Sequence, residues 1–73
     1  MSKNELKDLI AQALNIPVSD IPDDASTESV QGWDSLGHLN IILAVESATG
    51  HRFLTSEIPE LTSLDKLERA LQE

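Results

Sequence analysis

The chain has 73 residues, a net charge of −8 and no cysteine. Disulfide bonds and thiolate metal sites are therefore excluded, and a chain about half the length of a typical domain predicts a single domain over residues 1–73. The start, MSKNELKDL, lacks the apolar core of a signal peptide, and the longest nearly uncharged stretch, residues 35–45, is far shorter than the roughly 20 residues of a membrane span. We expect a monomer in the cytoplasm that does not insert into membranes.

The charge is unevenly distributed. No lysine or arginine lies between Asp8 and His51, whereas six carboxylates do. A surface of this kind is repelled by nucleic acid and by anionic membranes, so neither is an expected partner. It attracts proteins with basic patches, mainly by speeding association. We therefore expect docking on basic protein surfaces. The six carboxylates belong to Asp20, Asp23, Asp24, Glu28, Asp34 and Glu46.

The first expected element is a helix near the start of the chain. Ser2 with Glu5 three positions later forms a capping-box pattern. Apolar residues then recur at helical spacing, which predicts an amphipathic helix of about three turns. Pro17 should end it, because proline disfavours helical geometry in the residue before it. The apolar positions are Leu6, Leu9, Ile10, Ala13 and Leu14.

Residues 15–33, NIPVSDIPDDASTESVQGW, contain two prolines, a glycine and many short polar side chains. This composition predicts a loop, and long loops in compact domains are usually functional or packed. We expect an ordered loop that four spaced apolar residues hold against the core. These residues are Ile16, Val18, Ile21 and Val30.

A second helix is expected from Ser35 to about Thr49, with Asp34 as its N-cap and Gly50 as its stop. Gly37 should weaken its first turn. Its apolar residues are not confined to one stripe, so the helix is either central in a bundle or binds something on a second face. The expected core face is Leu39, Ile42 and Val45, with Ala48 and Thr49 at its edges, whereas Leu36 and Leu43 point elsewhere.

After Phe53 and Leu54, the segment TSEIPE predicts one short helical turn ended by Pro59. Thr62 with Asp65 resembles a second capping box, which would open a last helix. Alternating apolar patterns are absent, so strands are not expected. The predicted fold is all-α, a small four-helix bundle of three main helices and one short helix. The last helix would carry Leu64, Leu67, Ala70 and Leu71.

Catalytic and metal sites are disfavoured. Ser35, a histidine and an aspartate could be imagined as a triad, but Ser35 and His38 share one helix that fixes their relative angle. A chain this short also has little room for a cleft with an oxyanion hole, so we do not expect an enzyme. His38 and His51 form no HxxxH or ExxH pair, so we expect no metal site.

Ser35 has two remaining interpretations, a helix-start residue or an attachment point. Serine is common at helix starts. However, Asp34 already fills the N-cap, which leaves the Ser35 hydroxyl free to point outwards. A group on that hydroxyl would sit at the positive end of a helix, a position that favours a phosphate in particular.

The residues Gly32-Trp33-Asp34-Ser35-Leu36 resemble the G-x-D-S-L phosphopantetheine attachment motif of acyl carrier proteins. The likeness extends over the whole chain, from the first helix and the long loop to "SEIPE" and the helix after "LTS". It implies that a phosphopantetheinyl transferase joins the 4'-phosphopantetheine arm of coenzyme A to Ser35 through a phosphodiester. The thiol of the arm would then hold an acyl group as a thioester and carry it between enzymes.

The resemblance also implies that the second helix is the main recognition surface. Gly37, His38 and Asn40 stand where many fatty-acid-synthesis carriers have acidic residues. The tryptophan before the Asp-Ser pair, Trp33, resembles the pattern of carriers dedicated to secondary pathways. We therefore expect a freestanding acyl carrier protein of a dedicated pathway, with an acyl-loading ligase and downstream acyl-processing enzymes as partners. The alternatives are an aminoacyl or peptidyl carrier loaded by an adenylating ligase, and an unmodified acidic helical adaptor. The motif and recognition residues would be Gly32, Trp33, Asp34, Leu36, Asn40, Leu43, Glu46 and Ser47.

Overall fold

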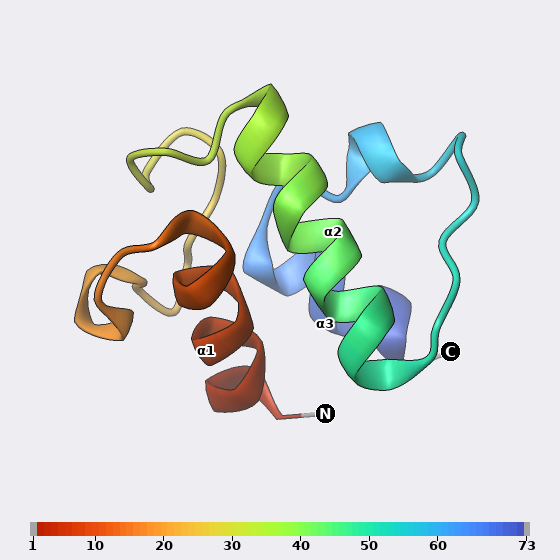
Figure 1. Ribbon diagram of the computed structural model, residues 1–73, viewed down its shortest axis with the longest axis horizontal. Coiled ribbons are helices and arrows are strands. Elements are labelled where there is room, and N and C mark those ends of the chain that lie inside the picture. The colour runs from red at the N-terminus through yellow and green to blue at the C-terminus, as the bar shows by residue number, and fades with distance from the viewer. Residues whose placement is uncertain (1, 73) are drawn as a thin grey trace.

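The computed structural model describes residues 2–72, and helices joined by loops make up its regular structure. In chain order it contains α1 (Lys3–Leu14), the 3₁₀ helix η1 (Val18–Asp20), α2 (Ser35–Thr49), the 3₁₀ helix η2 (Ile58–Glu60) and α3 (Leu64–Leu71). Figure 1 shows α1 beside α2, with the segment that follows α2 returning along the other side of that helix. Within the described residues, the β-type pairing is one isolated bridge, between Ser26 and Ser63. The all-α prediction is confirmed, although the 3₁₀ helix η2 stands in place of the short fourth helix.

Helix α1 begins as its capping box predicts. The Ser2 hydroxyl accepts a hydrogen bond from the Glu5 N–H at 3.2 Å, and a Glu5 carboxylate oxygen accepts one from the Ser2 N–H at 3.2 Å. The helix ends at Leu14, before the residue that Pro17 restricts, because Asn15 adopts the left-handed conformation at φ 57°. The Asn15 N–H then bonds to the Ala11 and Gln12 carbonyls, which closes the last turn.

The loop over residues 15–33 is ordered and largely packed as expected. Ile21 and Val30 are buried and Ile16 is half-buried. Val18 is the exception, because its side chain is 46 % exposed. Residues 18–20 form η1, which the sequence did not predict, and this turn directs Val18 outwards while the residue that follows it, Ile21, points inwards.

The core face of α2 differs from the predicted one. Ile42 and Val45 are buried as expected, but Ile41 takes the place of Leu39, which is 52 % exposed. Ala48 and Thr49 are also exposed. Position 37 explains the difference, because buried Gly37 starts a row at four-residue spacing that continues through Ile41 and Val45.

The C-terminal part corrects two local predictions. Ser63, not Thr62, is the N-cap of α3, and its hydroxyl accepts a hydrogen bond from the Lys66 N–H at 3.1 Å. The Thr62–Asp65 capping box is therefore wrong by one position. Pro59 lies inside η2 and does not end a helix, because a 3₁₀ turn tolerates proline near its start.

All three helices contribute to one hydrophobic core. Leu6, Ile10, Leu64 and Leu67 are fully buried, and the loop adds Ala25 and Trp33. Within residues 2–72, none of the helices is both long enough and apolar enough to span a bilayer.

Candidate functional site

Ser35 is the first helical residue of α2, and Asp34 caps the helix in front of it. An Asp34 carboxylate oxygen accepts a hydrogen bond from the Gly37 N–H at 2.9 Å. The Ser35 side chain is exposed. Because Asp34 satisfies the capping role, the Ser35 hydroxyl faces solvent at the positive end of α2.

The loop that leads to Ser35 presses closely on the first turn of α2. Gly32 adopts φ 93°, in the left-handed region that favours glycine. A Cβ on Gly37 would overlap the Gly32 carbonyl oxygen and lie 2.8 Å from a methyl group of Leu14. Gly37 thus permits this close approach, a role that its low helix propensity did not reveal.

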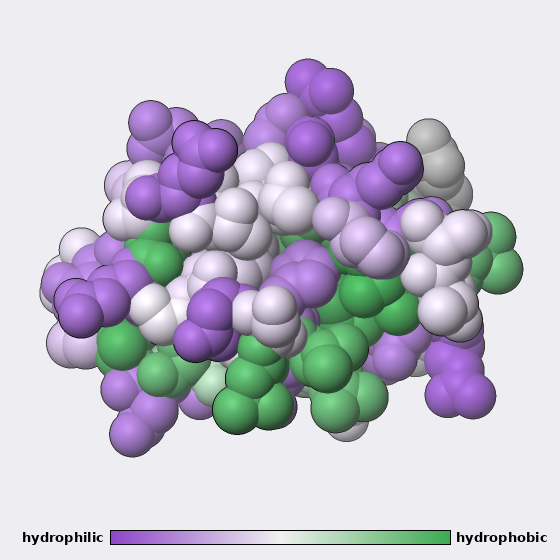
Figure 2. All heavy atoms as spheres, turned by 90° about the horizontal axis from the view of Figure 1, so that it is seen from above, coloured by the Kyte–Doolittle hydropathy of each residue, from purple (hydrophilic) through white to green (hydrophobic). Residues whose placement is uncertain are grey.

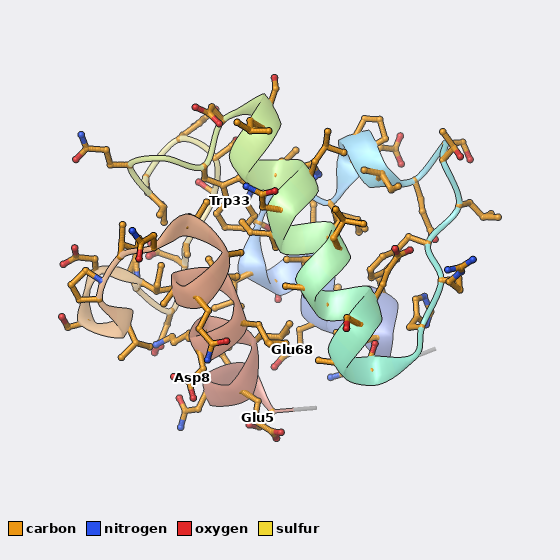
Figure 3. The ribbon with its side chains drawn as sticks, in the orientation of Figure 1. Glu5, Asp8, Trp33 and Glu68 are labelled. Carbon is orange, nitrogen blue, oxygen red and sulfur yellow. The ribbon has the colours of Figure 1, made fainter. Side chains whose placement is uncertain are left out.

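Trp33 belongs to the core and not to a partner surface, which corrects that part of its expected role. Its side chain is only 2 % exposed, and Figure 3 shows it beside the first turns of α2. The indole Nε1–H donates a hydrogen bond to His38 Nδ1 at 3.0 Å. His38 Nε2 lies 2.7 Å from the Ile58 carbonyl oxygen. Trp33, His38 and Ile58 therefore form a continuous hydrogen-bond chain.

A groove of about 540 Å³ opens beside Ser35. Its walls come from four parts of the chain: the loop at Thr27, the first turns of α2, η2, and Thr62 just before α3. Leu39, Ile58 and Pro59 supply apolar surface. A group attached to Ser35 would find both apolar and polar contacts within this groove.

The outer face of α2 carries exposed leucines and no exposed charged residue. Leu36, Leu39 and Leu43 are 70 %, 52 % and 62 % exposed, and Asn40 and Ser47 are exposed on the same helix. Figure 2 shows hydrophobic side chains protruding at one edge of the molecule with hydrophilic ones around them. Leucines at i, i+3 and i+7 fall along one side of a helix, so these three make a continuous ridge.

Glu46 lies on α2 but its carboxylate is engaged within the fold. One of its oxygens accepts a hydrogen bond from the Phe53 N–H at 2.9 Å, and the residue is half-buried. Another of the acidic residues is also paired, since Asp23 forms an ion pair with Lys7. The hydrogen bond and the charge of Lys7 hold the pKa of Asp23 below its usual range.

The predicted residues thus divide into groups. Gly32, Asp34 and Leu36 surround Ser35, whereas Asn40, Leu43 and Ser47 are exposed further along α2. Sequence reasoning missed Thr27, Ile58 and Thr62 as walls of the groove at Ser35, and it missed the hydrogen bonds of His38 to Trp33 and Ile58. For His38 a signal existed, because a buried tryptophan N–H needs an acceptor. Over residues 2–72, no cluster of three or more possible metal ligands is present.

The chain belongs to the family of phosphopantetheine-binding carrier proteins, because the family described as "Phosphopantetheine attachment site" matches residues 4–71. It is similar to the Polyketide-8 synthase acyl carrier protein 2 of Streptomyces avermitilis, with 33 % identity over 64 residues that cover 88 % of this chain and 74 % of that protein. The resemblance to acyl carrier proteins is confirmed. Phosphopantetheine is the group that this family binds covalently, and the family serves as carriers for biosynthetic enzymes.

Proposed function

We propose that Ser35 is the attachment residue and that residues 1–73 act as one carrier domain for acyl groups. The observation that carries this proposal is the position of Ser35, exposed at the start of α2 with its capping role already taken by Asp34. The positive end of the helix favours the phosphate of the linkage. The groove beside Ser35 offers room for the part of the arm nearest the protein.

In the transfer, Ser35 Oγ forms a bond to the phosphorus that carries the pantetheine of coenzyme A. The phosphoanhydride bond breaks, adenosine 3',5'-bisphosphate leaves, and the hydroxyl proton passes to a base. His38 is a poor base for this step because both of its ring nitrogens are engaged, with Trp33 and with Ile58. We expect the phosphopantetheinyl transferase to supply the base, so that the chain itself acts as a substrate and not as an enzyme. Once attached, the arm supplies a terminal thiol that holds an acyl group as a thioester.

The similarity to a polyketide synthase acyl carrier protein supports acyl cargo in a dedicated pathway. An aminoacyl or peptidyl carrier has the same attachment chemistry, so cargo has to be tested directly. The arm-bearing protein is incubated with acyl-loading and aminoacyl-adenylating ligases, and the intact mass identifies the thioester that forms. A stable aminoacyl thioester without any acyl thioester would favour the alternative.

The acidic residues of the loop, Asp20, Asp24 and Glu28, are exposed and lie outside the leucine ridge of α2. Partner enzymes that dock here would need an apolar surface for the ridge and basic residues for the loop. Charge would then mainly speed association, while the leucines hold the complex.

Intact-protein mass tests the proposed function. The chain is incubated with coenzyme A and a broad-specificity phosphopantetheinyl transferase, and we expect a gain of one phosphopantetheinyl group. Ser35→Ala should abolish the gain, whereas Ser56→Ala, at an exposed serine outside α2, should retain it. An unchanged wild-type mass, or a gain that persists in Ser35→Ala, would overturn the assignment. An unmodified adaptor would instead bind its partner equally well with and without Ser35.

A further inference from the structure

His38 joins three segments that meet around Ser35. It accepts a hydrogen bond from the side chain of Trp33, two residues before Ser35, and it contacts the carbonyl of Ile58 in η2. We propose that His38 is a positioning residue for the modification of Ser35, because its neutral imidazole holds both segments against the first turn of α2. This inference rests on the proposed role of Ser35 as the attachment residue.

The contacts of His38 define one tautomer. An indole N–H can only donate, so His38 Nδ1 must be the acceptor and carries no proton. A backbone carbonyl can only accept, so His38 Nε2 must carry the proton and donate it to Ile58. Both ring nitrogens are satisfied only in the neutral form protonated at Nε2. Among the amino-acid types, only histidine has one ring nitrogen that accepts a hydrogen bond and another that donates one.

The hydrogen bonds near Ser35 show why this matters for its presentation. The His38 N–H bonds to the Asp34 carbonyl at 2.7 Å, so the first turn that contains Ser35 closes on His38 itself. Trp33 is buried and bonded to His38, which fixes the chain just before Ser35. On the other side, Ile58 and Pro59 form a wall of the groove at Ser35. The His38 side chain therefore holds the first turn of α2, which carries the Ser35 hydroxyl, between Trp33 and Ile58.

Group transfer is sensitive to such placement, since a misplacement of about 1 Å costs on the order of 10²-fold in rate. His38→Ala removes both contacts, and we expect kcat/KM of the transferase for this protein to fall about tenfold. Trp33→Phe keeps the bond to Ile58, and His38→Gln can keep it through its amide N–H, so each should show a smaller loss. Ser2→Ala is the matched control, because it removes the cap of α1 at the opposite end of the molecule from the start of α2 (Figure 1).

The spectroscopic test uses ¹⁵N NMR of the histidine ring together with the indole N–H of Trp33, the only tryptophan in the chain. We expect His38 protonated at Nε2 alone, and a displaced indole resonance in His38→Gln. A proton on Nδ1 would overturn the inference. The inference would also be overturned if the transferase modified His38→Ala and His38→Gln as fast as it modifies Ser2→Ala. If His38→Ala does not fold, His38→Gln and Trp33→Phe decide. Failure of the wild-type protein to be modified would instead count against the proposed function itself.

Discussion

Helices α2 and α3 use apolar residues in different ways. In α3 the leucines at 64 and 67 are fully buried, and the exposed positions are charged or polar. In α2 three apolar residues are buried, yet Leu36, Leu39 and Leu43 protrude into solvent. The core accounts for the apolar residues of α3, but it does not account for the leucine ridge of α2. Burying a leucine side chain stabilises by roughly 1.5–3 kcal/mol. A partner that covers this ridge would gain this burial free energy, because folding leaves the three leucines exposed.

Leucine truncations should give the largest contrast. Leu64→Ala should lower the free energy of unfolding by about 2–5 kcal/mol, because it opens a cavity in the core. Leu43→Ala should change it by less than about 0.5 kcal/mol, as for other surface substitutions. Urea unfolding followed by circular dichroism measures both. Equal losses in the two variants would mean that Leu43 also supports the core, and the distinction between the helices would fail.

Gly37→Ala tests the inner face of α2 near Ser35. Alanine improves helix propensity by about 1 kcal/mol, but the added methyl group meets the Gly32 carbonyl and a Leu14 methyl. Overpacking of this kind costs typically about 1–3 kcal/mol, so we expect a net loss of stability. Ser47→Ala, at an exposed site of the same helix, should be neutral or slightly stabilising. A melting temperature above that of the wild type in Gly37→Ala would show that the loop can move away without cost.

Removing the N-cap of α2 or that of α3 should cost similar stability, but only the first should affect function. Asp34→Ala and Ser63→Ala each remove a side-chain acceptor from a helix start, and each should cost about 1 kcal/mol. Only Asp34 adjoins Ser35, so only Asp34→Ala should also slow phosphopantetheine transfer. Parallel unfolding and transfer assays on the two variants separate these effects. A similar slowing in Ser63→Ala would mean that general stability limits the transfer.

The smallest effect is expected at the start of α1. The Ser2 N–H and hydroxyl hold the pKa of the Glu5 carboxyl below its usual range. A lowered pKa means that this contribution to stability is present above the pKa of the unfolded chain and is lost as pH falls through the folded value. Carbon NMR titration of Glu5 should show the lowered pKa, and Ser2→Ala should raise it. Because Ser2→Ala keeps the backbone N–H, a pKa that does not change in this variant would contradict the bond from the Ser2 hydroxyl.

Local signals carried most of the sequence prediction. The capping box of α1 and both caps of α2 were readable because each is formed by residues close together in the chain. The core face of α2 was not, since a helix that is apolar on several sides does not reveal which side packs. The start of α3 was misplaced because Thr62 with Asp65 matches a capping-box pattern, whereas the actual cap, Ser63, is followed by Lys66 at that spacing. Ser35 stood out through its motif, but the groove beside it comes from residues distant in sequence, which no local pattern specifies.

The bridge between the long loop and the start of α3 has a consequence for the order of folding. The Thr27 N–H bonds to the Thr62 carbonyl at 3.0 Å and the Leu64 N–H to the Ala25 carbonyl at 2.9 Å. These bonds join distant parts of the chain, so their formation requires closure of a large chain loop that contains all of α2. We expect α1 and α2 to form early and the loop before Ser35 to reach its native path only when α3 docks. A newly made chain would thus complete the surroundings of Ser35 only after its last helix is available.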